Sequence, residues 1–115
     1  MASGSTYDDV RRVALAMPGV EDGTSYGTPA LKAKKKLMVR LREEGDTIVV
    51  KMPFDQRAEL MEGDPLTYFI TDHYESHEWI LVRLARLAPE GLPDLLWTAY
   101  RAATASVRPK PNLLS

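Results

Sequence analysis

Basic side chains at alternating positions are the first feature of this sequence that suggests chemistry. The alternation of polar and apolar residues from 36 to 42 predicts a strand with one buried face. Its inward side chains would be Leu37, Val39 and Leu41, and its outward side chains Lys36, Met38, Arg40 and Arg42. Outward cations can neutralise phosphates. Between residues 32 and 42 no acidic residue interrupts the basic ones, which are Lys32, Lys34, Lys35, Lys36, Arg40 and Arg42.

Residues of later segments are expected to join this outward face. Strand pairing would place beside Arg40 the side chains of Lys51, Trp79, Leu81 and Arg83. Cations next to stacking rings are the combination that single-stranded nucleic acids exploit. The candidate nucleic-acid-binding residues are Lys32, Lys36, Arg40, Lys51 and Arg83 for phosphates, with Trp79 and Tyr74 for stacking. The competing interpretation is a solvated face on which aliphatic stems shield the indole ring.

Two further clusters offer different chemistry. Tyr26 and Tyr74 could border the same face and form a small-molecule or peptide cleft with Trp79, although aromatic clusters on sheets usually serve packing. His73 and His77 lie in a loop whose acidic residues could complete a metal site. A solvated polar loop is the favoured interpretation there, so we predict no metal and no other cofactor. The acidic residues concerned are Asp72, Glu75 and Glu78.

Composition narrows the function classes. The chain has 115 residues, 15 basic and 16 acidic, for a formal net charge of −1, which argues against strong general affinity for DNA. Without cysteine it has no disulfide, thiolate metal site or cysteine nucleophile. No Walker, nucleophile-elbow or HExxH motif is present, which favours a non-enzymatic role. No segment has the apolar length of a membrane span, so we expect a cytoplasmic monomer without a membrane partner.

The hydrophobic periodicity and the turn residues predict an α+β fold. An antiparallel sheet is covered on one face by helices, in the order helix, strands, helix, strands, helix. Residues 1–115 would form a single domain with a core at 6–107 and a flexible tail at 108–115. The expected helices are 6–17, 53–62 and 92–106; an irregular strand and turn span 20–29; and strands follow at 36–42, 47–52, 66–71 and 79–87.

The order of these elements and several local phrases resemble the MmcQ/YjbR family of small bacterial proteins. The resemblance implies a frataxin-like (CyaY-like) sandwich, also described as a double-wing DNA-binding fold, and members are commonly labelled DNA-binding. A fold does not establish a function. The phrases are Met-Pro-Gly-Val at 17–20, Ser-Tyr-Gly-Thr-Pro-Ala at 25–30, Lys-Leu-Met-Val-Arg at 36–40, Val-Val-Lys at 49–51, His-Tyr at 73–74 and Glu-Trp-Ile-Leu-Val-Arg-Leu at 78–84.

Three functional hypotheses follow. The first is a non-enzymatic protein that binds DNA through the basic and aromatic sheet face. The alternative is a protein-interaction or small-ligand-binding module that uses the same face or the loop at 72–78. A frataxin-like metal protein is less favoured, because the first helix carries only Asp8 and Asp9. A continuous positive face would support DNA, whereas a face interrupted by acidic residues such as Glu43, Glu44 or Glu75 would support the alternative.

Overall fold

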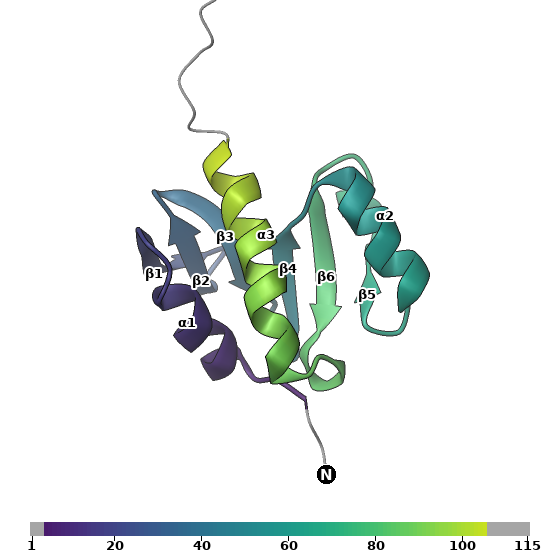
Figure 1. The fold of residues 1–115 in the computed structure, drawn as a ribbon, viewed down its shortest axis with the longest axis horizontal. Coiled ribbons are helices and arrows are strands. Elements are labelled where there is room, and N and C mark those ends of the chain that lie inside the picture. The colour runs from purple at the N-terminus through teal and green to yellow at the C-terminus, as the bar shows by residue number, and fades with distance from the viewer. Residues whose placement is uncertain (1–3, 106–115) are drawn as a thin grey trace, which may run out of the picture.

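The fold is an open antiparallel sheet with helices over one face (Figure 1). The computed structural model describes residues 4–105, so the tail predicted at 108–115 lies outside the described residues. Within these residues the sheet order is β1-β2-β3-β4-β6-β5, and each strand pair is antiparallel. The predicted α+β class is confirmed. The strands are β1 Val20–Ser25, β2 Thr28–Ala33, β3 Lys36–Leu41, β4 Thr47–Lys51, β5 Tyr68–Phe69 and β6 Trp79–Arg83, and the α-helices are α1 Tyr7–Leu15, α2 Phe54–Gly63 and α3 Leu92–Ala105.

Helix α1 begins with the capping residues that the sequence indicates. The Thr6 side chain accepts a hydrogen bond from the backbone N–H of Asp9, and the Asp9 carboxylate accepts one from the backbone N–H of Thr6. This reciprocal capping satisfies two backbone donors that the helix itself cannot pair. Val10 and Ala14 are then fully buried against the sheet, so these residues at i and i+4 form the apolar face of the helix.

The helices and the sheet share one hydrophobic core. Val39 of β3, Val50 of β4 and Ile80 of β6 are cross-strand neighbours, and all are fully buried beneath the helices. In Figure 1, α1 and α3 cross this side of the sheet, while α2 lies beside β5 and β6. We call the opposite side the outer face. One row of neighbours on it is Ala30, Arg40, Val49, Leu81 and Phe69.

A register shift between β2 and β3 reverses the predicted side-chain orientations at the start of β3, from Lys36 to Met38. Leu31 pairs with Val39, but Lys32 pairs with Leu37, which leaves Met38 as an extra residue on β3. Such a bulge changes the phase of the alternation. Met38 is fully buried in the core beneath the helices, and Leu37 lies on the outer face. The prediction that Leu37 points inward and Met38 outward is therefore wrong.

Several predicted segments differ in length. The region 20–29 contains strand β1 and the start of β2, joined at Tyr26 and Gly27, rather than one irregular strand. The strand expected at 66–71 is confined to Tyr68–Phe69, and β6 ends at Arg83 because Leu84–Arg86 form a 3-10 turn. The outer face was expected to be exposed, yet Val49, Leu81 and Arg40 on it are buried. None of the described helices is long and apolar enough to cross a membrane.

Two hairpins turn through residues in the left-handed backbone region. Tyr26 and Gly27 have φ angles of 55° and 80° between the paired residues Ser25 and Thr28. Lys34 and Lys35 have φ angles of 52° and 71° between Ala33 and Lys36. Positive φ at both central residues is the geometry of a type I′ turn, which favours Asn-Gly. A lysine or tyrosine in this conformation is strained.

The turn at Lys34 and Lys35 provides a test of this strain. We expect Lys34→Asn/Lys35→Gly to raise the free energy of unfolding by about 1 kcal/mol, because these residues adopt positive φ at lower cost. Urea unfolding measures the change. Lys36→Asn is the control, since it removes a lysine just outside the turn and should give no gain. An equal gain from the control would attribute the effect to charge and not to backbone strain.

Tyr7 of α1 has a buried hydroxyl without a hydrogen-bond partner among the described residues. Burial is the main cause that raises its pKa from 10.0 to about 12, and Asp22 adds to the rise while Arg11 opposes it. The native state therefore favours the neutral phenol. The preference for the neutral phenol has its full effect on stability below pH 10. Between pH 10 and about 12 the free energy of unfolding falls, since the tyrosine of the unfolded chain ionises first.

Replacement of Tyr7 by phenylalanine should stabilise the protein and flatten this alkaline loss. We expect a gain of about 1 kcal/mol at neutral pH, because a buried unpaired hydroxyl is removed while the ring remains. Denaturant unfolding between neutral pH and pH 12 measures both effects. Tyr26→Phe is the control, because its ring is 85% exposed. A loss of stability in Tyr7→Phe would show that the hydroxyl has a stabilising partner such as bound water.

Candidate functional site

The outer face carries a pocket of about 240 Å³. Its walls come from segments far apart in the sequence: the β1–β2 turn, strands β3, β4 and β6, and the loop between β5 and β6. Apolar and aromatic side chains with a few polar groups are typical of ligand sites. The lining residues are Tyr26, Leu37, Arg40, Val49, His73, Tyr74, His77 and Trp79.

Arg40 is the buried cation of this pocket. Its side chain is 9% exposed, and its Nη1 donates hydrogen bonds to Thr28 Oγ1 at 3.3 Å and to the Leu41 carbonyl oxygen at 3.5 Å. The Glu43 carboxylate lies 3.8 Å from the same nitrogen. The guanidinium carbon is 5.2 Å from the centre of the Tyr26 ring, a cation–π contact. Arg40 thus links the strained β1–β2 turn to the centre of the sheet.

Arg57 of α2 holds the loop that forms the opposite wall. Its Nη1 donates hydrogen bonds to the backbone carbonyls of Tyr74, His77 and Trp79 at 2.9, 2.7 and 3.1 Å. Its Nη2 donates to the carbonyl of Glu75 at 3.0 Å. The residue is only 8% exposed. One buried guanidinium therefore satisfies four carbonyls of a segment that forms no strand pairs of its own until Trp79.

Sequence reasoning missed Arg57, although the helical pattern contained a signal. The helical spacing of Phe54, Ala58 and Met61 predicts an apolar face for α2, and Arg57 lies on the same side of the helix at i+3 from Phe54. In the structure Arg57 is the buried residue of α2, while Phe54 is 43% exposed and Ala58 is also exposed. The Phe54 ring covers the guanidinium, 4.9 Å from its carbon. A charged residue on the predicted inner face of a helix indicates a buried charge that needs acceptors.

The structure brings together some of the predicted site residues and separates others. Arg40, Trp79 and Tyr74 line the pocket, and the Lys51 ammonium lies beside it, 4.9 Å from the centre of the Trp79 ring. Lys32, Lys36 and Arg83 do not line it. Lys36 pairs with Ala33, whose side chain belongs to the core beneath the helices, and so departs from its predicted place on the outer face.

Two basic residues outside the pocket lie close to other groups of the protein. Lys32 is opposite Glu21 in the β1–β2 pair. The Arg83 Nε donates to the Leu66 carbonyl at 3.1 Å, and its guanidinium carbon lies 4.0 Å from the centre of the Phe69 ring. Carboxylates lie near the arginines at the end of β3 and just after it, since Glu43 is near Arg40 and Glu44 lies 3.6 Å from Arg42. The positive charge is therefore interrupted.

The two histidines lie at the pocket rim without a metal-binding arrangement. The ring centres of His73 and His77 are 6.4 Å apart, and His73 packs edge-on against Tyr74 at 4.9 Å. Across residues 4–105 no group of three or more His, Asp or Glu side chains is placed to hold a metal ion. The nearby Glu78 carboxylate instead accepts a hydrogen bond from the backbone N–H of Phe54 at 3.2 Å.

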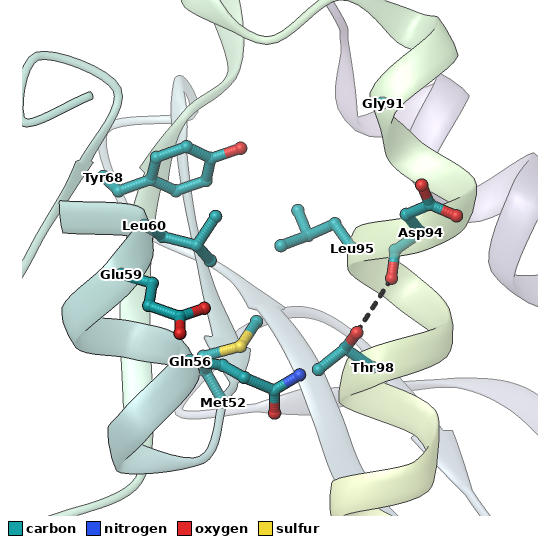
Figure 2. Close-up of a pocket in the computed structure, with 9 residues that line it drawn as sticks. All are labelled: Met52, Gln56, Glu59, Leu60, Tyr68, Gly91, Asp94, Leu95 and Thr98. Atoms are coloured by element: carbon teal, nitrogen blue, oxygen red, sulfur yellow. Dashed lines mark hydrogen bonds between the residues drawn. The ribbon is translucent and has the colours of Figure 1, made fainter. Parts of the chain in front are cut away.

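A second pocket, of about 210 Å³, lies between α2 and α3 (Figure 2). Its carboxylates belong to Glu59 and Asp94, which are both exposed. Burial, with a smaller contribution from Asp64, raises the pKa of the Tyr68 hydroxyl in its wall. Solvated charges give this pocket less capacity to select a ligand than a buried cation does. The lining residues are Met52, Gln56, Glu59, Leu60, Tyr68, Gly91, Asp94, Leu95 and Thr98.

The fold and the pocket define a small α+β domain with a recess on the uncovered side of its sheet. Comparison of structures finds the same fold in the crystal structure of Deinococcus radiodurans protein DR2400, whose domain is DUF419. The TM-score is 0.78 with 20% sequence identity, over 94% of this chain and 85% of that one. At this identity the likeness concerns the fold alone.

Sequence comparison identifies the family. The profile of the YjbR family matches residues 15–102, and the chain therefore belongs to the YjbR family. Uncharacterized protein Rv2570 of Mycobacterium tuberculosis and uncharacterized protein Mb2600 of Mycobacterium bovis are each 24% identical over 111 residues, which cover 84% of this chain and 86% of each relative. The predicted resemblance to the family is confirmed. Both relatives are uncharacterized proteins, so their names assign no biochemical activity.

Arg57 should be essential for the pocket wall. We expect Arg57→Met to lower the free energy of unfolding by about 2–4 kcal/mol, because four carbonyls lose a charged donor. Hydrogen exchange should accelerate first at the loop amides of Tyr74, Glu75 and His77. Arg11→Met is the control, since its ion pair with Asp22 is half-exposed and should contribute little. Equal effects of the two substitutions would contradict the proposed role of Arg57.

Proposed function

We propose that this protein is a non-enzymatic binding domain and that its ligand is a small molecule held in the outer-face pocket. The observation that carries the proposal is the convergence of a buried cation with three aromatic side chains from separate segments: Arg40, Tyr26, Tyr74 and Trp79. A concave site with apolar walls and a few convergent polar groups is the usual form of a small-molecule site.

The distribution of charge favours this function over DNA binding through the same face. A nucleic-acid surface needs cations free to contact successive phosphates. Here Arg40 is buried near Glu43, and Arg83 is engaged by Leu66 and Phe69. The formal net charge of −1 adds no general attraction for a polyanion. DNA binding, which the family label suggests, is therefore the second candidate.

A binding role without catalysis agrees with the hydrogen bonds in the pocket. Nucleophilic catalysis by a hydroxyl requires a base within hydrogen-bond reach. Among the described residues neither His73 nor His77 forms a side-chain hydrogen bond to a hydroxyl group. The tyrosine and tryptophan rings provide surfaces for contact. We therefore assign recognition to the pocket and no reaction.

The two tryptophans allow a direct test by NMR. Trp79 lines the pocket, whereas Trp97 is on α3 and packs against Tyr100, so their indole N–H signals report on different places. We expect at least one of phenol, benzamide, benzoate and benzylamine to shift the Trp79 signal saturably and leave the Trp97 signal in place. Trp97→Phe assigns the two signals. The signals are recorded in a titration with each compound.

A labelled single-stranded oligothymidylate provides the competing arm of this experiment. We expect no measurable binding by fluorescence anisotropy at low ionic strength. Binding that weakens steeply with salt would replace the small-molecule proposal by the DNA hypothesis. Failure of all four ring compounds to move the Trp79 signal would also refute the proposal, because the pocket would then have no affinity for the simplest ligands that fit its walls.

A further inference from the structure

The hydrogen bonds of Arg40 leave one edge of its guanidinium without an acceptor. Its side-chain hydrogen bonds within residues 4–105 both leave from Nη1, to Thr28 and to Leu41. The N–H groups of Nε and Nη2 find no acceptor in the same part of the chain. They keep some contact with solvent, because the buried unpaired polar atoms of the described residues are the Tyr7 hydroxyl oxygen and Arg42 Nε. The Nε and Nη2 edge of Arg40 is therefore open to an acceptor from outside the protein.

Glu43 does not fill this role. The shortest distance from its carboxylate to the guanidinium is 3.8 Å, to Nη1, which exceeds that of a good hydrogen bond. The Glu43 side chain is also 68% exposed, so solvent screens its charge. A ligand that offers its own acceptors to the free edge would gain hydrogen bonds that the protein does not make.

The free edge fits a planar anion. Parallel N–H groups of a guanidinium match the two oxygens of a carboxylate, and such bidentate pairs are stronger and more directional than neutral hydrogen bonds. The Lys51 ammonium, which lies over the neighbouring Trp79 ring, adds a second positive charge close to the pocket. Together these cations favour a negatively charged ligand and disfavour an amine.

The remaining walls fit a single ring. Tyr26, Tyr74 and Trp79 supply aromatic surfaces, and Leu37 and Val49 supply apolar ones. The volume of about 240 Å³ is below the range of about 300–1,000 Å³ that is usual for drug-sized ligands. Offset or edge-on contacts between rings would add to the energy of burial.

We propose that the pocket binds a small aromatic carboxylate, with the carboxylate on the Nε and Nη2 edge of Arg40 and the ring against Tyr74 and Trp79. This inference rests on the proposed small-molecule function and specifies the ligand class. The proposed anion would not suit the pocket between α2 and α3, because Glu59 and Asp94 there would repel it.

Benzoate and benzamide test the carboxylate, because the two molecules have nearly the same shape and differ in charge. We expect benzoate to shift the Trp79 indole signal with a dissociation constant of about 1 mM or lower, and about ten-fold tighter than benzamide. Cyclohexanecarboxylate, which keeps the charge and lacks the planar ring, should bind more weakly than benzoate. Benzylamine should bind most weakly of the four.

Substitution of Arg40 identifies the group responsible. Arg40→Met should abolish the preference for benzoate over benzamide while leaving ring binding in place. Arg83→Met is the matched control on the same sheet face, since Arg83 does not line the pocket, and should keep the preference. Circular dichroism and thermal unfolding verify that each variant is folded. If Arg40→Met does not fold, the benzoate and benzamide comparison on the unaltered protein decides the question.

The possible outcomes separate the two proposals. Equal binding of benzamide and benzoate would overturn the carboxylate inference and leave the small-molecule function standing. Tighter binding of phenyl phosphate than of benzoate would overturn the ligand class in favour of a phosphate. No shift of the Trp79 signal by any ring compound would overturn both.

Discussion

The pocket depends on one buried interaction, the set of hydrogen bonds from Arg57 to the loop before β6. Backbone carbonyls that leave a sheet need other donors, and here a single guanidinium supplies them for Tyr74, Glu75, His77 and Trp79. The constraint is electrostatic as well as geometric, because a charge buried to this extent is tolerated only when it is well paired. Helix α2 thus fixes one wall of a recess on the outer face. Helices α1 and α3 cross the opposite face of the sheet (Figure 1).

The two buried arginines have similar burial but different hydrogen-bond pairing. Arg40 and Arg57 are equally exposed, at 8% each. Arg57 donates to four carbonyls, whereas the bonds of Arg40 are two long ones from a single nitrogen. Burial alone does not distinguish them. The difference is that the protein supplies acceptors for the first guanidinium and none for the Nε and Nη2 edge of the second.

The sequence patterns predicted those parts of the fold that depend on interactions within a single helix or strand. The capped start of α1, the apolar stripe of α3 and the α+β order follow from spacings within one element. The bulge at Met38 does not, because it depends on how β3 pairs with β2, and it reverses Leu37 and Met38. The role of Arg57 was equally hidden, since its acceptors lie 17 to 22 residues further along the chain. The grouping of Arg40, Tyr74 and Trp79 was foreseen, but the burial of Arg40 was not.

Backbone strain alone does not distinguish the candidate site from other turns in this fold. Tyr26 has a φ of 55°, but Lys34 and Lys35 are also in the left-handed region, and neither lines the pocket. What distinguishes Tyr26 is that its strained turn holds a largely exposed ring beside the incompletely paired Arg40. Two departures from local preference therefore coincide in one recess, and a stability-optimised domain would have little reason to keep both. The proposed aromatic carboxylate would contact both the ring of Tyr26 and the open edge of Arg40.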